Sequence, residues 1–156
     1  SPRLPDLNWT VVGGIPGNLK GEKRWKKQWD ARSVAQGRVT FTGWLSQEAL
    51  HEVYAQADIL IAPSLYETFG LSVLEAMSYG LGICASNTGG LRNLLEHNRS
   101  ALLSPVGDQE LLCSHIATLD ANITLRHSLG REAKQRANRD FHWDQVIRTL
   151  IQAYEL

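Results

Sequence analysis

The sequence has little cysteine, no long apolar run and no excess of charge of one sign, and each absence excludes a class of protein. Its two cysteines, Cys84 and Cys113, are too few for a disulfide framework and lack the spacing of a metal site. No apolar run approaches the roughly 18 residues of a membrane span. The 16 basic and 16 acidic side chains cancel, whereas nucleic-acid-binding domains usually carry a basic excess. We therefore expect no nucleic-acid partner, two buried thiols and a reducing, cytoplasmic compartment.

What remains is the composition of an ordinary globular chain. Apolar residues make up 43% of the sequence, enough to build a hydrophobic core. The 156 residues suffice for one domain. The chain does not begin with Met, and Ser1–Pro5 has the composition of a loop inside a longer protein. We therefore expect residues 1–156 to form a single domain that is a fragment of a longer polypeptide.

Strands and helices are predicted to alternate along the first two thirds of the chain. Short β-prone or apolar runs predict five strands, at Trp9–Val12, Arg38–Thr42, Ile59–Ala62, Gly82–Ser86 and Ala101–Leu103. Helices are predicted at 21–36, after an N-cap at Ser46, at 71–79 and at 91–97. This alternation predicts an α/β fold with a doubly wound parallel, Rossmann-like sheet flanked by helices. Ligands of such sheets bind at the carboxyl ends of the strands.

The last third of the chain is predicted to be entirely helical. Asp108 is a plausible N-cap for the first of three helices. The second helix is predicted from leucines and alanines at helical spacing, namely Leu125, Leu129, Ala133 and Ala137. In the third helix, apolar residues from Trp143 to Tyr154 form a stripe with a period of 3.6 residues. This is the pattern of an amphipathic helix.

The most informative segment runs from Pro63 to Met77. It begins at the end of Ile59–Ala62, whose continuous apolar run predicts the most buried strand. A loop containing Gly70 then opens a helix, whose free N–H groups and positive dipole end favour a phosphate. Glu67 precedes this helix start and Glu75 lies about one turn inside it. Carboxylates placed there can accept hydrogen bonds from sugar hydroxyls.

This segment resembles the donor-binding, C-terminal half of the retaining group 1 glycosyltransferases of the GT-B fold. Glu67-Thr-Phe-Gly-Leu-Ser-Val-Leu-Glu75-Ala-Met matches the family's two glutamates, their spacing and the residues that follow each. The flanking segments resemble the family in the same order, namely Val39–Gly43, Ala57–Ile59, Pro63–Ser64, Gly89–Gly90 and Phe141–Trp143 with Tyr154. The resemblance covers essentially the whole chain and implies half of a GT-B architecture and a role in carbohydrate biosynthesis.

The resemblance also implies a role for individual residues. Glu67 would be the catalytic residue that contacts hydroxyls of the donor sugar, and Glu75 would hold the ribose hydroxyls of the nucleotide. Further donor-binding residues would be Thr68, Phe69, Gly70, Leu71, Gly13, Gly14, Trp44 and Leu45. The donor would be a nucleoside diphosphate sugar, and neither a cofactor nor a metal is expected.

Some features depart from the family's pattern. Thr68, Gly82, Asn93 and Ser100-Ala101 replace residues that are common there, which leaves the two-glutamate pattern intact and the identity of the donor open. Nothing before Trp9 matches the family's first strand or the Arg and Lys of its diphosphate loop. We expect these parts and an acceptor-binding domain to lie upstream, and the present chain alone to be inactive.

Two segments have alternative interpretations. Gly13-Gly14 with Pro16 and Gly17 fits a simple strand-exit turn better than a phosphate loop. Residues 20–32 combine six basic side chains with Trp25 and Trp29 on one helical face. A helix that covers the sheet is the favoured interpretation, and peripheral contact with the cytoplasmic face of a membrane is the alternative.

The predicted function is the donor-binding part of a glycosyltransferase that moves a sugar from a nucleoside diphosphate to an acceptor with retention. One alternative is a nucleotide-sugar epimerase on the same fold, which would need an acid–base set that the sequence does not display. Another is a non-catalytic partner module of a glycosyltransferase complex. The presence of both Glu67 and Glu75 argues against this second alternative.

Overall fold

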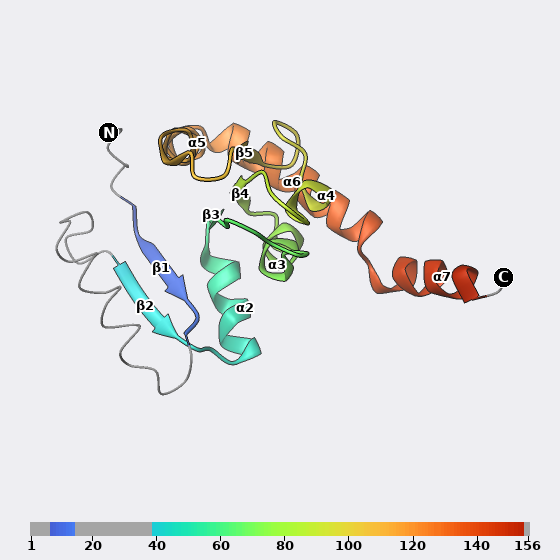
Figure 1. The fold of residues 1–156 in the computed structure, drawn as a ribbon. Coiled ribbons are helices and arrows are strands. Elements are labelled where there is room, and N and C mark those ends of the chain that lie inside the picture. The colour runs from blue at the N-terminus through green and yellow to red at the C-terminus, as the bar shows by residue number, and fades with distance from the viewer. Residues whose placement is uncertain (1–6, 15–38, 155–156) are drawn as a thin grey trace. The chain divides into compact units, whose positions relative to one another are not determined.

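The computed structural model describes residues 7–14 and 39–154 (Figure 1). The predicted helix at 21–36, its Trp25–Trp29 stripe and residues 16–17 lie outside these ranges. The chain divides into two units, one of residues 4–53 and one built mainly from residues 54–156. Among the described residues, no helix is long and apolar enough to cross a membrane.

The described part of the unit of residues 4–53 contains two parallel strands and most of a helix. These elements are β1 (Trp9–Val12), β2 (Val39–Gly43) and α2 (Gln47–Gln56), whose last turn falls in the other unit. Trp9 pairs with Val39, and an irregularity after Val11 places Val12 opposite Gly43. The predicted N-cap of α2 is confirmed, because the Ala49 N–H donates to Ser46 Oγ at 3.3 Å.

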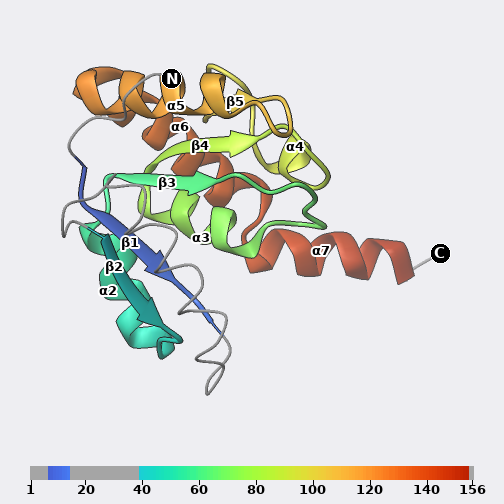
Figure 2. The ribbon, with the colours of Figure 1, turned by 60° about the vertical axis from the view of Figure 1, so that its left-hand side comes forward.

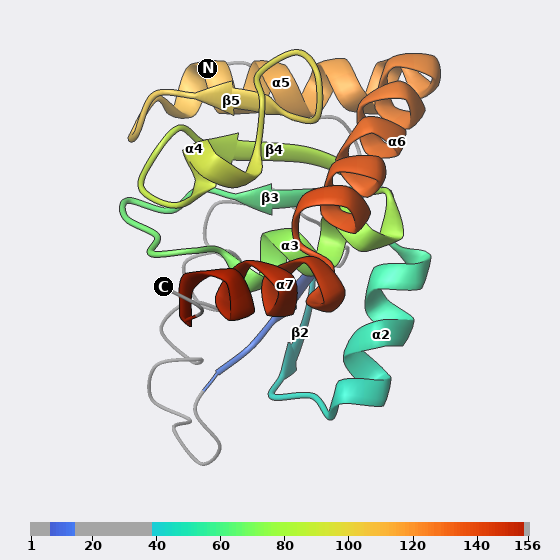
Figure 3. The ribbon, with the colours of Figure 1, turned by 90° about the vertical axis from the view of Figure 1, so that its right-hand side faces the viewer.

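The second unit is built around a three-stranded parallel sheet. Its strands are β3 (Ile59–Ala62), β4 (Gly82–Ser86) and β5 (Leu102–Ser104), in the order β3-β4-β5. Figure 2 shows β3 and β4 side by side and pointing in the same direction, and Figure 3 shows β5 parallel to β4. The helices are α3 (Leu71–Tyr79), α4 (Leu91–Leu94), α5 (Gln109–Ala121), α6 (Ile123–Asp140) and α7 (Trp143–Tyr154) (Figure 3). The predicted α/β fold with parallel sheets and flanking helices is therefore confirmed.

The most buried strand is β4. We expected Ile59–Ala62 to be the most buried strand, and that expectation was wrong. Every residue of β4 is buried, whereas every residue of β3 is partly exposed. Position in the ladder does not account for this difference, because β5 is also an end strand and is fully buried. The covering helices do account for it, since α5 packs against β4 and β5, and α6 packs against β4. Because neighbouring residues of a strand point to opposite faces, the burial of Ile83 and Cys84 shows that both faces of β4 are covered.

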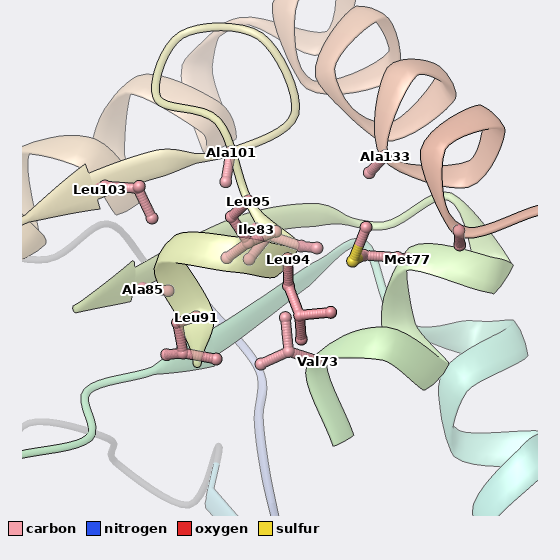
Figure 4. Close-up of a cluster of buried hydrophobic side chains, with 11 residues drawn as sticks. Val73, Met77, Ile83, Ala85, Leu91, Leu94, Leu95, Ala101, Leu103 and Ala133 are labelled. Atoms are coloured by element: carbon pink, nitrogen blue, oxygen red, sulfur yellow. The ribbon is translucent and has the colours of Figure 1, made fainter. Parts of the chain in front are cut away.

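The main hydrophobic core lies on the face of β4 that carries Ile83. There α3 contributes Val73 and Met77, and α4 contributes Leu91 and Leu94 (Figure 4). Small side chains of α6, such as Ala133, complete the cluster and allow that helix to pack closely. This core fixes the position of α3, the helix that follows the predicted donor loop.

The two cysteines differ in burial. Cys84 is fully buried in β4, and this burial raises the pKa of its thiol to about 12. Cys113 of α5 is only half-buried, so the prediction of two buried thiols was right for Cys84 and wrong for Cys113. Both thiols are free.

The helix predicted at 91–97 is shorter than expected, because α4 ends at Leu94. Leu95 has an extended backbone, and the Glu96 N–H donates to Ser100 Oγ at 2.8 Å instead of continuing the helical pattern. The strand predicted at 101–103 begins one residue later, and Ala101 forms only an isolated bridge with His97.

The apolar stripe of the last helix is present, but it is not buried. No residue of α7 is buried among the described residues, and Trp143 and Leu150 are 74% and 51% exposed. The part of the chain that the structure describes therefore leaves this apolar face uncovered. By contrast, the predicted N-cap of α5 is confirmed, because Asp108 Oδ1 accepts from the Leu111 N–H at 2.9 Å.

Gly82, one of the departures from the family pattern, has a structural explanation. A Cβ atom at this position would lie 2.7 Å from Cγ of Arg126 and 3.2 Å from Cδ1 of Leu119. Arg126 is buried against β4, and its Nη2 forms a 2.9 Å ion pair with Asp58. Its Nη1 also donates to the Leu119 carbonyl oxygen at 3.1 Å. The missing side chain of Gly82 therefore makes room for a buried arginine that bonds Asp58 and Leu119.

Helices α3 and α6 meet at a pair of glycines. Gly80 ends α3 in the left-handed conformation, at φ 77°. A Cβ atom on Gly130 would lie 2.0 Å from the carbonyl oxygen of Gly80. Gly130 therefore allows the backbone of α6 to touch the end of α3, although glycine is a poor helix former.

We predict that Gly130→Ala lowers the free energy of unfolding by roughly 1–3 kcal/mol. Alanine is the better helix former by about 1 kcal/mol, so a simple propensity effect would have the opposite sign. Urea unfolding followed by circular dichroism measures the change. Ser128→Ala, on the exposed side of the same helix, is the matched control and should leave the stability nearly unchanged. Equal stability of the wild type and Gly130→Ala would contradict the close contact.

Candidate functional site

The predicted site is the loop that leaves β3 and enters α3. Gly70 is the N-cap of α3, and its carbonyl oxygen accepts from the N–H groups of Val73 and Leu74 at 3.0 and 2.9 Å. No side chain caps this end of the helix. The first N–H groups of α3 and the positive end of its dipole are therefore not occupied by a side chain and can receive an anion.

Glycine is required at position 70 for two reasons. Its φ of 95° lies in the left-handed region, which side chains other than glycine rarely adopt. A Cβ atom there would also lie 2.5 Å from Cδ2 of Leu91. The loop thus reaches α3 directly over the core, and the helix start is held in one position.

The same loop is tied to the turn between β4 and α4. The Gly90 N–H donates to the carbonyl oxygen of Glu67 at 2.8 Å, and Thr88 Oγ1 donates to that of Leu65 at 3.3 Å. A Cβ atom on Gly89 would lie 2.0 Å from the Glu67 carbonyl oxygen. One on Gly90 would lie 2.2 Å from the Thr68 carbonyl oxygen. This explains in physical terms the glycine pair that the sequence matched only by resemblance.

The two glutamates are held in different ways. Glu67 lies in the loop, and its Oε1 accepts from the Thr68 N–H at 3.0 Å. Glu75 lies in the second turn of α3, and its Oε2 accepts from the hydroxyl of Tyr54 at 3.0 Å. Both glutamate side chains are partly exposed. The structure therefore has one carboxylate on each side of the uncapped helix start, both reachable from solvent.

The remaining predicted residues of this loop are exposed. Thr68 and Leu71 are open to solvent, and the Phe69 ring is 40% exposed. Phe69 also packs edge-on against Phe141, with ring centroids 6.1 Å apart. This loop therefore exposes apolar as well as polar groups to solvent.

Four further predicted donor-binding residues belong to the unit of residues 4–53. Gly13 and Gly14 have φ of 113° and 142°, and the Gly13 N–H donates to the Gly43 carbonyl oxygen at 2.9 Å. This bond continues the pairing of β1 with β2 by one residue, and the turn predicted over residues 13–17 extends beyond the described residues. Trp44 is 67% exposed and Leu45 is half-buried. That these residues share a site with Glu67 and Glu75 remains a prediction of the sequence.

Tyr54 is the residue that the sequence analysis missed. It falls in the helix that the sequence predicts after Ser46, and no role was assigned to it there. A buried tyrosine, however, needs a hydrogen-bond partner for its hydroxyl, and that requirement was the available signal. For metal ligands, the described residues contain no group of three or more histidine, cysteine, aspartate or glutamate side chains that could hold an ion. The expectation of a metal-free site stays a prediction.

Comparison with known proteins gives a family match over most of the chain. The family described as "Glycosyl transferases group 1" matches residues 1–136. D-inositol 3-phosphate glycosyltransferase of Stackebrandtia nassauensis is 32% identical over 155 residues, which are 99% of this chain and 35% of that protein. Sulfoquinovosyl transferase of Arabidopsis thaliana is 33% identical over 66% of this chain and 21% of its own length. The chain thus spans about a third or less of these curated relatives.

Solved structures share the fold. Sucrose-phosphate synthase of Thermosynechococcus elongatus matches 95% of this chain and 38% of its own, with a TM-score of 0.85 and 28% identity. HepE of Anabaena, solved in complex with UDP, matches 97% of this chain and 41% of its own, with a TM-score of 0.87 and 22% identity.

We predict that Gly89→Ala displaces the loop of residues 65–68, because its new Cβ atom would meet the Glu67 carbonyl oxygen at 2.0 Å. Loss of the bond from the Gly90 N–H should speed hydrogen exchange at that amide by about tenfold or more. Exchange followed by NMR or mass spectrometry measures it. Gly107→Ala is the matched control, since Gly107 also has a positive φ, of 82°, but nothing lies within 4 Å of its Cβ position. Equal effects of the two variants would mean that backbone strain alone is responsible.

Proposed function

The chain belongs to the group 1 glycosyltransferase family, and from that premise we propose that it is the nucleotide-sugar-binding part of a retaining enzyme. Its α/β fold is that of the GT-B glycosyltransferases, and the family transfers sugars. The observation that carries the proposal is the pair Glu67 and Glu75 on either side of the uncapped start of α3. No other described part of the chain combines carboxylates with a free helix N-terminus after a parallel strand.

In the proposed complex, the nucleoside diphosphate lies with its phosphates toward the start of α3. Backbone N–H groups of residues 70–72 and the helix dipole then stabilise the negative charge that grows on the diphosphate as the sugar leaves. Glu75 accepts hydrogen bonds from the ribose hydroxyls. Glu67 accepts them from hydroxyls of the sugar and orients the ring for transfer. These groups position the donor and stabilise charge, and the acceptor is supplied by another part of the enzyme.

The proposed donor is a nucleoside diphosphate sugar, bound without a metal. HepE has been solved with UDP-glucose as well as with UDP, which makes UDP-glucose the first donor to test. GDP and ADP sugars complete the panel, because the described residues do not select the base. The proposed retention is tested on the product, whose anomeric configuration NMR reads directly.

We predict that Glu75→Ala weakens nucleotide binding. Hydrogen bonds to a charged group are worth about 1.5–3 kcal/mol, which corresponds to a loss of roughly 10- to 150-fold. Calorimetric titration of the full-length protein with UDP, GDP and ADP measures the affinity. Glu110→Ala, an exposed first-turn glutamate of α5, is the control and should bind like the wild type. A folded Glu75→Ala variant with unchanged affinity would remove Glu75 from the nucleotide site.

For Glu67 we predict the opposite pattern. Glu67→Ala should lower the rate of sugar transfer by about a hundredfold or more, because an interaction with the reacting sugar is lost. Its affinity for the nucleoside diphosphate should stay within about threefold, or under roughly 0.7 kcal/mol, of the wild type. Transfer assays with the donor panel and calorimetry on the same preparation separate the two effects. An equal loss of nucleotide binding would show that the roles of the two glutamates are misassigned.

A further inference from the structure

One buried hydroxyl reaches the candidate site from a different helix. Tyr54 lies in the last turn of α2 and is 7% exposed. Its hydroxyl donates to Oε2 of Glu75 at 3.0 Å and lies 3.2 Å from the carbonyl oxygen of Ser72, both in α3. The tyrosine and the glutamate are 21 positions apart in the sequence, so only the fold brings them together.

The position of this hydroxyl is fixed by its surroundings. The Tyr54 ring stacks on the ring of Tyr79, at the end of α3, with centroids 5.5 Å apart and planes inclined by 25°. Burial raises the pKa of the Tyr54 phenol, and the hydrogen bond to Glu75 raises it further. The group is therefore a hydrogen-bond donor at every pH at which the protein works.

Glu75 is left with free acceptor capacity. Its Oε1 has no hydrogen-bond partner among residues 7–14 and 39–154, and a carboxylate offers about four lone-pair positions in all. The bond from Tyr54 thus holds one oxygen and leaves the other for a ligand. Without this bond, the glutamate side chain would be free to rotate about three bonds at a half-exposed position of the helix.

We propose that Tyr54 is a positioning residue that sets the carboxylate of Glu75 in the orientation that binds the two ribose hydroxyls of the nucleotide. The inference rests on the proposed function, since it needs Glu75 to be the ribose ligand. A phenylalanine would fill the same space and keep the stacking on Tyr79, so the hydroxyl itself is the group with a role. Its effect on the ligand passes entirely through Glu75.

The test is Tyr54→Phe, which removes a single oxygen atom from the full-length protein. Ordering a side chain on binding costs about 0.5–1.5 kcal/mol, so the affinity for a ribonucleoside diphosphate should fall by roughly 3- to 10-fold. The probes are UDP, GDP and ADP, each compared with its 2′,3′-dideoxy analogue, which lacks both hydroxyls. Affinity for the dideoxy analogue should not change, because Glu75 has nothing to bind there.

A double-mutant cycle isolates the path through Glu75. In a Glu75→Ala background, Tyr54→Phe should have no further effect on ribonucleotide affinity. Tyr154→Phe is the matched control for loss of a tyrosine hydroxyl, since Tyr154 is 87% exposed at the end of α7. It should bind both kinds of nucleotide like the wild type. Melting temperatures of all variants verify that each is folded.

The outcomes separate this inference from the proposed function. If Glu75→Ala binds ribonucleotides as tightly as the wild type, the proposed role of Glu75 fails, and the role of Tyr54 fails with it. If Glu75→Ala weakens binding and Tyr54→Phe does not, only the inference on Tyr54 is overturned. If Tyr54→Phe weakens the ribonucleotide and its dideoxy analogue equally, the hydroxyl has a structural role and the inference is also overturned.

Discussion

The candidate site depends on a close approach of two backbone segments. The loop that carries Glu67 passes so near the turn after β4 that no Cβ atom fits on Gly89 or Gly90. The hydrogen bond from the Gly90 N–H to the Glu67 carbonyl oxygen replaces side-chain packing there. Because β4 is the central strand of the sheet, this contact anchors the loop to the most buried part of the unit. The position of Glu67 and of the start of α3 follows from it.

Helix α3 is held at both ends in a similar way. Gly70 begins it over Leu91, and Gly80 ends it against Gly130 of α6. Between these ends, Val73 and Met77 are buried in the core, and Glu75 lies outside it. A helix fixed in this manner can present backbone N–H groups and a carboxylate to a ligand with little rearrangement. That rigidity suits a site whose proposed work is to position a donor and stabilise charge.

The family match and the local geometry support each other without overlapping. The match rests on sequence and fold, and it covers 35% of a curated relative and 38% of a solved structure. The geometry rests on hydrogen bonds and close contacts within a few elements. It explains why glycine is needed at positions that the sequence pattern only matches. Gly89, Gly90 and Gly82 are such residues. Transfer also needs an acceptor, which the described residues do not identify.

The sequence by itself determined what depends on neighbouring residues. The N-caps at Ser46 and Asp108 were predicted because a capping side chain bonds within its own helix turn. The bounds of Ile59–Ala62, Leu71–Tyr79 and Gly82–Ser86 follow from local periodicity and glycine or proline punctuation, and all three were predicted correctly. The two-glutamate segment was also visible as a pattern, and its spacing carried the resemblance that the family match confirmed.

Only the tertiary structure decided what depends on partners far apart in the chain. Burial of β4 rather than β3 follows from the packing of α5 and α6 against β4, which local composition does not encode. The exposure of the apolar stripe of α7 is likewise a property of the fold, because the described residues leave that face uncovered. Tyr54 bonds a glutamate 21 positions away, so no pattern around either residue could have paired them. Contacts of this kind form only when the sheet sets the distance between elements, and that distance is a property of the whole unit.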